Sequence, residues 1–356
     1  SATDGNWAVT ASKLTTVLGD GVRLAGDLTV TNITNEATAL TDFTSVTTAA
    51  NSVTLTGDGA WTVAANQLTT ALDTTAGTGA KIKFAATDTL TVTGIAAGAA
   101  ETAALTAFTV PLTGADRVIL TATDSNWSVA SEDLAVALTE GVNFAGALTV
   151  TGIANSAETA ALTAYTNAIT GAATNKLVAS DGTWSVAATD LNAAIGAGQI
   201  RLAGDLTVID ITSGFETATL DLYNNTNTGS NTIKLSATDG NWAVTASKLT
   251  TVLGDGVRLA GDLTVTNVTD KAAALTAYTG STTHADIVTL QTASSVSNEW
   301  SVAETALNSA LGDGVRLIGD LTVTAIATET DASTTYSTSN TGATNVLLTA
   351  ADGNWS

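Results

Sequence analysis

Residues 1–32 read SATDGNWAVTASKLTTVLGDGVRLAGDLTVTN, and residues 236–267 repeat the same letters without a change. Outward from this stretch, a tryptophan recurs about every 58 residues, at Trp7, Trp61, Trp127, Trp184, Trp242, Trp300 and Trp355. A second aromatic residue follows at Phe43, Phe108, Tyr165, Tyr223, Tyr278 and Tyr336. Self-similarity at a fixed period is the signature of a repeat architecture. The chain is therefore predicted to be an array of similar copies.

The array divides into six copies and the start of a seventh. We place the copies at residues 1–57, 58–123, 124–180, 181–238, 239–293 and 294–350, and the start of the seventh at 351–356. The second copy is longer because of an insertion near residues 73–80. Insertions in repeat arrays map to loops on one face, so we expect a surface loop there.

Each copy has two halves with the same plan, a strand followed by a short helix. In the fourth copy, residues 184–186 alternate as in a strand, and apolar residues of 188–195 have the spacing of one helical face. Residues 200–208 alternate again. The second helix is clearest at residues 155–165 of the third copy, where Asn155 and Glu158 have the spacing of a capping box.

A copy of about 58 residues is too small to bury its apolar face well by itself. Stacking successive copies lines up like residues in one continuous core. The expected fold is therefore a repeat solenoid of stacked coils, with parallel β-strands and short helices. It would be an α/β or mainly-β solenoid in which each repeat consists of two half-coils.

Composition excludes several classes of function. The chain has 33 acidic and 12 basic residues and a net charge of −21, which argues against binding nucleic acid. No run of 18 apolar residues occurs, so no membrane insertion is expected. There is no cysteine and one histidine, and nearly every polar feature recurs with the period, whereas an active site is a single constellation. We therefore expect neither an enzyme nor a cofactor, with calcium as the one metal left open.

The recurring aromatic residues have two interpretations. They lie in phase with valine and leucine neighbours, which indicates rungs of a buried core. The alternative is an exposed stripe that stacks on glycan. The predicted core rungs are Trp7, Trp61, Trp127, Trp184, Trp242, Trp300, Phe43, Phe108, Tyr165, Tyr223, Tyr278 and Tyr336.

An arginine precedes an aspartate by four residues in four copies. The four are Arg23 with Asp27, Arg201 with Asp205, Arg258 with Asp262 and Arg316 with Asp320. The third copy loses both members at once, since Asn143 and Ala147 stand there. Joint loss is what a charge pair would produce, because one ion left without its partner is costly. We predict structural charge pairs along or between neighbouring coils.

Aspartates also recur at two turns. One set precedes the tryptophan by three residues, at Asp4, Asp58, Asp124, Asp181 and Asp239, and the other lies at Asp20, Asp255 and Asp313. Aspartate before glycine or serine is typical of turns, where its side chain accepts from the backbone N–H two residues on. Carboxylates and turn carbonyls are also calcium ligands. Both sets are therefore candidate calcium ligands with plain turns as the alternative.

The units DGNWAV, GDGVRLAGDLTVT and ETAALTAY resemble the tandem arrays of giant bacterial cell-surface proteins. These include repetitive adhesins, surface-layer-like proteins and extracellular filament proteins. The resemblance implies a secreted, structural protein, located outside the cell or at its surface. We therefore expect a segment of a fibre, sheath or surface layer that self-associates head to tail. An adhesive module that recognises glycan or another cell is the alternative.

Overall fold

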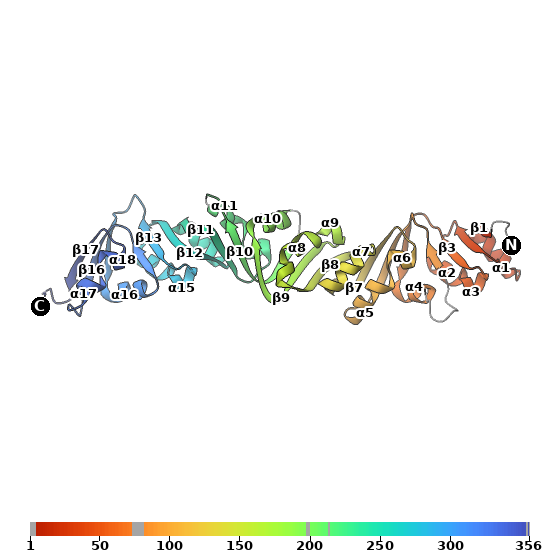
Figure 1. Cartoon of the computed structure of the whole chain (residues 1–356), viewed down its shortest axis with the longest axis horizontal. Helices are drawn as coiled ribbons and strands as arrows, with labels where there is room; N and C mark the ends of the chain where they lie inside the picture. The colour runs from red at the N-terminus through yellow and green to blue at the C-terminus, as the bar shows by residue number, and fades with distance from the viewer. Residues whose placement is uncertain (1–4, 73–81, 197–199, 213, 354, 356) are drawn as a thin grey trace. The chain divides into compact units, whose positions relative to one another are not determined.

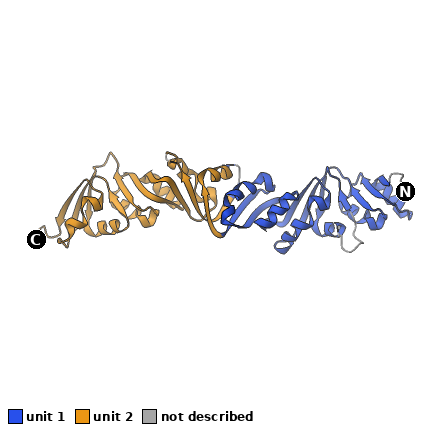
Figure 2. Cartoon of the chain, in the orientation of Figure 1, with its two compact units in different colours: residues 1–180, 196–200 blue, residues 181–195, 201–356 orange. Residues whose placement is uncertain are grey.

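The computed structural model describes residues 5–72, 82–196, 200–212, 214–353 and 355. The contacts divide the chain into two compact units (Figure 2). The first comprises residues 1–180 and 196–200, and the second comprises residues 181–195 and 201–356. Asp4 and the insertion predicted near residues 73–80 lie outside the described residues.

In the first unit, strands and helices alternate along the chain (Figure 1). The strands are β1 Asn6–Thr10, β2 Asp27–Thr31, β3 Ser52–Leu55, β4 Ala60–Ala64, β5 Ile82–Phe84, β6 Thr89–Ile95, β7 Arg117–Ala130, β8 Val142–Ile153 and β9 Thr174–Ala187, which continues into the second unit. The helices are α1 Ala11–Gly19, α2 Glu36–Asp42, α3 Ser45–Thr48, α4 Ala65–Leu72, α5 Ala99–Ala107, α6 Val110–Thr113, α7 Ser131–Thr139, α8 Glu158–Ala164 and α9 Asn167–Thr170.

The second unit follows the same alternation. Its strands are β10 Ile200–Ile211, β11 Ile233–Thr245, β12 Val257–Val268, β13 Val288–Thr292, β14 Glu299–Ala303, β15 Val315–Leu317, β16 Asp320–Ile326 and β17 Asn345–Ala350. Its helices are α10 Ala188–Gly196, α11 Glu216–Leu222, α12 Asn225–Thr228, α13 Ala246–Gly254, α14 Lys271–Ala277, α15 Gly280–Thr283, α16 Glu304–Gly312, α17 Ala332–Thr335 and α18 Thr338–Thr341.

Within each unit, paired strands are either consecutive or next but one along the chain. In the first unit, one sheet has the order β1-β2-β3-β5 and another runs β4-β6-β7-β8-β9. In the second unit, strands run β10-β11-β12-β13-β15, and a separate sheet has the order β14-β16-β17. The pairs whose register is resolved are parallel. The predicted combination of parallel β-sheet with short helices is therefore confirmed.

The long strands consist of two segments joined at a turn. In β11, residues 233–236 pair with 257–260 of β12, and residues 241–245 pair with 262–266. The register shift between the segments falls on the Asp-Gly turn at Asp239. β7 pairs with β8 in the same way. Elsewhere the two segments are separate strands that belong to different sheets, as β3 and β4 or β13 and β14.

The core is formed by alternate residues of these strands. Leu263, Val265 and Val268 of β12 are buried, and so are the equivalent Leu148, Val150 and Ile153 of β8. The helix that follows each strand covers this layer with residues spaced i and i+3, such as Leu249 and Val252 of α13. The hydrophobic period of the sequence thus places one face of most strands and helices in the core.

The helix predicted at residues 155–165 differs in detail. Residues 155–157 form a 3-10 turn, and α8 begins at Glu158 after Ala157. A second helix of four residues, α9, follows and was not predicted. It recurs as α3, α6, α12, α15 and α18. Four residues are too few for a hydrophobic period, so the sequence pattern could not reveal it.

Candidate functional site

The recurring tryptophans make one hydrogen bond in nearly every copy. The indole Nε1 of Trp242 donates to the carbonyl oxygen of Ala260 at 3.0 Å, and that of Trp184 to Ala203 at 3.0 Å. Equivalent bonds join Trp7 to Ala25, Trp127 to Ala145 and Trp300 to Ile318. For Trp127, Trp184 and Trp242 the acceptor lies in the next strand along the chain, whereas Ala25 and Ile318 lie just before a strand. The tryptophan therefore ties consecutive strands together as well as filling the core.

In the second copy a carboxylate replaces this carbonyl. Trp61 Nε1 donates to Asp88 Oδ2 at 2.8 Å, and the N–H of Gly57 donates to the same oxygen at 3.4 Å. Asp88 is 2% exposed. The basic residue of this copy, Lys83, instead donates to the carbonyl oxygens of Pro111 and Leu112. The two charged residues retained in this copy therefore have separate structural roles.

The aromatic residues predicted as core rungs are buried, with one exception. Trp61, Trp127, Trp184, Trp242, Trp300, Phe43, Phe108, Tyr165, Tyr223, Tyr278 and Tyr336 are buried. Trp7 is half-buried. Stacking on glycan needs an exposed ring face. The buried rings at these positions cannot provide one, so an adhesive role would have to use other residues.

Three tyrosine hydroxyls each donate a hydrogen bond to the first residue of a helix that lies earlier in the chain. Tyr223 donates to the carbonyl oxygen of Ala188 at 2.8 Å, Tyr278 to that of Ala246 at 2.8 Å, and Tyr165 to that of Ser131 at 3.0 Å. Each acceptor is the first residue of a helix. Burial raises the pKa of Tyr223 to about 12 and also raises the pKa of Tyr165. These phenols are therefore structural hydrogen-bond donors in the folded protein.

Alkaline pH is expected to destabilise the fold through Tyr223. Its phenol stays protonated up to about pH 12 in the folded chain, whereas a tyrosine in the unfolded chain ionises near pH 10. The unfolded state therefore binds fewer protons between these values, and the free energy of unfolding falls as pH rises, by up to about 2–3 kcal/mol. Absorbance of phenolate at 295 nm should show a component near pH 12 that Tyr223→Phe removes. Coincident titration curves above pH 11 would contradict the prediction.

A glycine marks a close crossing of consecutive strands. Gly261 has φ +95°, and a Cβ built there would lie 2.2 Å from the carbonyl oxygen of Gly240. The same approach occurs at Gly26, Gly146, Gly204 and Gly319, with 2.0–2.3 Å to the turn of the preceding strand. In the first copy the N–H of Asp27 donates to that turn carbonyl, of Gly5, at 2.9 Å. Only glycine fits where backbone approaches backbone so closely.

The predicted Arg–Asp charge pairs are not formed by Arg23, Arg258 and Arg316. Arg23 donates to the carbonyl oxygens of Leu18 and Val22, and Arg258 to those of Leu253 and Val257. Arg316 donates to the carbonyl oxygen of Val315. These guanidinium groups thus bind backbone carbonyls near the end of the preceding helix or on their own strand.

The aspartates of the same motif have other partners or face solvent. Asp27 accepts from Ser52 Oγ at 2.7 Å, and Asp320 accepts from Asn345 Nδ2 at 2.8 Å. Asp205 and Asp262 are exposed. The stem of Arg201 lies against Gly229.

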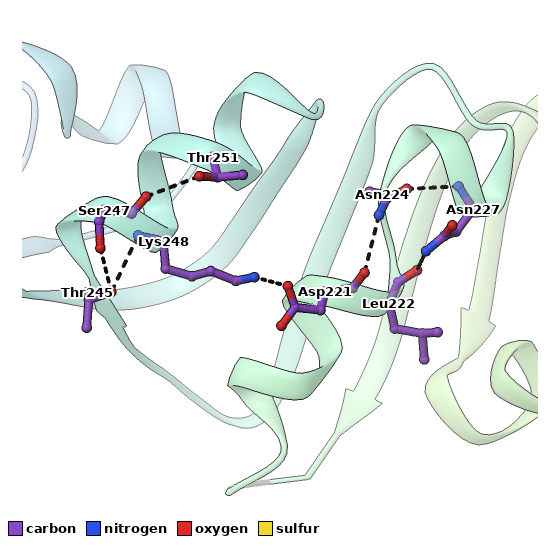
Figure 3. Close-up of polar contacts among 8 residues, drawn as sticks. All are labelled: Asp221, Leu222, Asn224, Asn227, Thr245, Ser247, Lys248 and Thr251. Atoms are coloured by element: carbon purple, nitrogen blue, oxygen red, sulfur yellow. Dashed lines mark hydrogen bonds and ion pairs between the residues drawn. The ribbon is translucent and has the colours of Figure 1, made fainter.

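Strand geometry explains this correction. Residues four apart on a strand are separated by about 13 Å, too far for contact between Arg258 and Asp262. Pairing across the strands brings like residues together, with Arg258 opposite Lys234 and Asp262 opposite Asn241. An ion pair does join Lys248 of α13 and Asp221 of α11 (Figure 3). Close to this ion pair, Asn224 Oδ1 accepts a hydrogen bond from the N–H of Asn227. Thr245 Oγ1 accepts one from the N–H of Lys248.

The aspartates that precede tryptophan act in turns. Asp124 Oδ1 accepts from the N–H of Asn126 at 3.0 Å, and Asp239 Oδ1 from that of Asn241 at 3.0 Å. Asp58 and Asp181 accept from the N–H two residues on in the same way. These are the contacts of an Asx turn. Asp20, Asp255 and Asp313 are exposed residues at the ends of α1, α13 and α16.

Metal-ligating side chains do not gather in the described part of the chain. No group of three or more His, Asp or Glu residues there could hold a metal ion. Nor is any helix of the described residues long and apolar enough to cross a membrane.

A buried threonine recurs in every copy and was missed in the sequence. Thr228 ends α12, where its hydroxyl donates to the carbonyl oxygen of Asn224 at 2.9 Å and accepts from the N–H of Ser230 at 3.2 Å. The same residue recurs at Thr48, Thr113, Thr170, Thr283 and Thr341, all fully buried. The signal was available as Thr-x-Ala or Thr-x-Ser before the next strand, but threonine is so frequent in this chain that the motif does not stand out.

Thr228→Val is expected to lower the free energy of unfolding by about 1–3 kcal/mol, because the N–H of Ser230 stays buried without a partner. Thr226, on the same helix, is exposed. Thr226→Val makes the same chemical change in solvent and should alter stability by no more than about 0.5 kcal/mol. Urea denaturation followed by circular dichroism measures both variants. Equal effects would show that the buried hydroxyl is not required.

The comparisons of this chain with known proteins found no match. No protein-family model matches the chain. No curated protein and no solved structure matches it either. The functional interpretation therefore depends on the residues described above.

Proposed function

We propose that the chain is a structural segment of an extracellular fibre, sheath or surface layer, built as a solenoid of repeats of about 58 residues. Its function would be to provide length and stiffness and not to turn over a substrate. The observation that carries the proposal is the recurrence of the same inward-facing contacts in successive copies. Trp242 and Thr228 have counterparts at the equivalent position of other copies.

The character of these contacts supports a load-bearing role. The recurring tryptophan and tyrosine residues join one strand or helix to another, as with Trp242 and Ala260 or Tyr223 and Ala188. An array joined in this way depends on contacts between neighbouring repeats, so its stability grows with the number of repeats. Such an array can be extended without a new core.

Small-angle scattering of the full chain tests the proposal. A stacked array grows in length, so we expect the maximum dimension to be several times the width. A compact particle of equal dimensions would overturn both the solenoid and the function. A chain shortened by two copies, ending at residue 238, should keep its cross-section and lose about a third of its length. An unchanged length would count against stacking.

A further inference from the structure

A charged residue stands seven positions before the second aromatic residue in every copy. These residues are Glu36, Glu101, Glu158, Glu216, Lys271 and Glu329. Five are glutamates and one is a lysine, so the position keeps a charge but not its sign. An ion pair would fix the sign, because its partner has a charge of its own. A backbone partner would not, because a peptide unit offers both a donor N–H and an acceptor carbonyl oxygen.

In the first copy this residue reaches a strand of the next copy. Glu36, the first residue of α2, accepts a hydrogen bond through Oε2 from the N–H of Thr62 at 2.7 Å. Thr62 is the middle residue of β4, which is the last strand in the order of its sheet and pairs with β6. The carbonyl oxygen of Gly59 accepts from the N–H of Thr89 in β6, and the backbone groups of successive residues point to opposite sides of a strand. The N–H of Thr62, three residues on from Gly59, therefore lies on the free edge of β4.

In the fifth copy a lysine makes the corresponding contact with acceptor groups. Lys271, the first residue of α14, donates through Nζ to the carbonyl oxygen of Ser297 at 2.9 Å and to that of Glu299. β14 begins at Glu299 and is an edge strand of the sheet β14-β16-β17. The carbonyl oxygen of Asn298 accepts from the N–H of Asp320 in β16. The carbonyl groups of Ser297 and Glu299 therefore point away from β16, to the free edge.

Both contacts occur where a tryptophan strand begins after a break. β4 and β14 are separate from β3 and β13, whereas the equivalent segments of β7 and β11 continue a long strand. In the copies that lead into these long strands, the charged residue bonds the backbone just before its own helix. Glu101 accepts from the N–H of Gly98 at 3.1 Å, and Glu216 accepts from that of Gly214 at 2.7 Å. The contact with a strand edge thus accompanies the two interruptions of the strand.

We propose that Glu36 and Lys271 cover the free edges of β4 and β14 and so keep these strands from pairing with a strand of a second chain. An uncovered edge is a template for such pairing, and natural proteins protect it with short strands and charged side chains. Each of the two strands has five residues, so one occupied position leaves too few free backbone groups for a ladder. An incoming strand would have to displace a charged side chain from its hydrogen bond. The proposal concerns sideways contact between chains and does not depend on the proposed structural function.

Amide exchange tests the cover directly. Glu36→Ala removes the acceptor of the Thr62 N–H, so this amide should exchange about 10-fold faster or more. Glu36→Gln keeps an acceptor oxygen at the same place and should retain most of the protection. Glu132→Ala, at an exposed glutamate in the first turn of α7, removes the same charge and should leave the exchange of Thr62 unchanged. Nuclear magnetic resonance of the Thr62 amide measures all three variants.

Sideways association tests the consequence. Glu36→Ala lowers the net negative charge of the chain and Lys271→Ala raises it, so a change in repulsion alone would move association in opposite directions. An uncovered edge predicts instead that both variants associate more strongly than the unchanged chain. Small-angle scattering over a range of concentrations gives the cross-section of the particle, which sideways pairing widens and end-to-end contact does not. Glu132→Ala should keep the cross-section of the unchanged chain.

A change of sign at one position separates the cover from a particular charge. Ser301 has the place in β14 that Thr62 has in β4, because each follows the recurring tryptophan and pairs with the middle threonine of a Thr-Val-Thr or Leu-Thr-Val stretch. Its N–H therefore also lies on the free edge. Lys271→Glu can accept from this N–H as Glu36 does from Thr62. It should keep the cross-section of the unchanged chain, whereas Lys271→Ala should widen it.

Three results would overturn the proposal. They are exchange of the Thr62 amide that Glu36→Ala does not change, a cross-section that stays the same in both alanine variants, or one that widens as much in Lys271→Glu as in Lys271→Ala. Circular dichroism checks that each variant is folded, and if Glu36→Ala is not, the two Lys271 variants decide. None of these results alters the length of the single chain, which tests the proposed structural function separately.

Discussion

Trp242→Ala is expected to lower the free energy of unfolding by about 3–5 kcal/mol. Trp242 is 1% exposed, and its indole N–H is bonded to the carbonyl oxygen of Ala260. Alanine would leave a cavity and deprive that oxygen of its donor. Chemical denaturation followed by circular dichroism measures the loss.

The chain contains its own control for this substitution. Trp7 has the same sequence around it and the same hydrogen bond, to Ala25 at 3.0 Å, but it is only half-buried. Trp7→Ala should therefore cost about 1–2 kcal/mol, since less apolar surface returns to water. Equal losses for the two variants would show that the neighbouring layer does not cover Trp242.

Gly261→Ala is expected to be at least as damaging, with a loss of more than about 3 kcal/mol. The backbone at Gly261 has φ +95°, which strains any residue with a Cβ. The new Cβ would also lie 2.2 Å from the carbonyl oxygen of Gly240. Because that neighbour is backbone, relief requires moving two strands apart.

Two other glycines separate these causes. Gly240 has φ +71° and nothing within 4 Å of a built Cβ, so Gly240→Ala carries the backbone strain alone, about 1 kcal/mol. Gly254 ends α13 without a positive φ and has open space around it. Gly254→Ala should be neutral or slightly stabilising. Thermal unfolding of the three variants should rank them in this order. A small effect of Gly261→Ala would mean that the strands do not cross as closely as described.

Periodicity made the parallel sheets and short helices predictable. Alternation in residues such as 200–208 identifies strands whose inner face is buried, and the helical spacing of 188–195 identifies the helix between them. These signals depend on local chain geometry, and the structure has the predicted helix, α10, and the predicted strand, β10. The break between β3 and β4 coincides with a shorter link, because Leu55 precedes Trp61 by six residues whereas Leu235 precedes Trp242 by seven in the long strand β11.

The partners of charged residues were not predictable in the same way. Arg258 and Asp262 vary together among the copies, which indicates a shared environment and does not identify a contact. Between parallel strands of similar sequence, the residue opposite is often a similar one, as Lys234 is to Arg258. A comparison of copies thus shows which positions matter but not which ones face each other.

Buried polar groups were the hardest to foresee. Thr228 looks like any other threonine in the sequence, and its role follows from two backbone atoms that the four-residue helix places near it. Asp88 resembles the aspartates of the other copies in sequence, yet two additional residues between Phe84 and Leu90 bring it under Trp61. Both roles depend on tertiary geometry that hydrophobic period does not encode.

The identity of residues 1–32 and 236–267 also has a consequence for mass spectrometry. Cleavage within the two stretches releases fragments of equal mass, so one peak contains both. After deuterium labelling, the amides near Val22 and those near Val257 would take up the isotope at different speeds, because only the latter lie in a paired strand. A single peptide would then show two isotopic envelopes, and the slower one would serve as an internal reference for the faster.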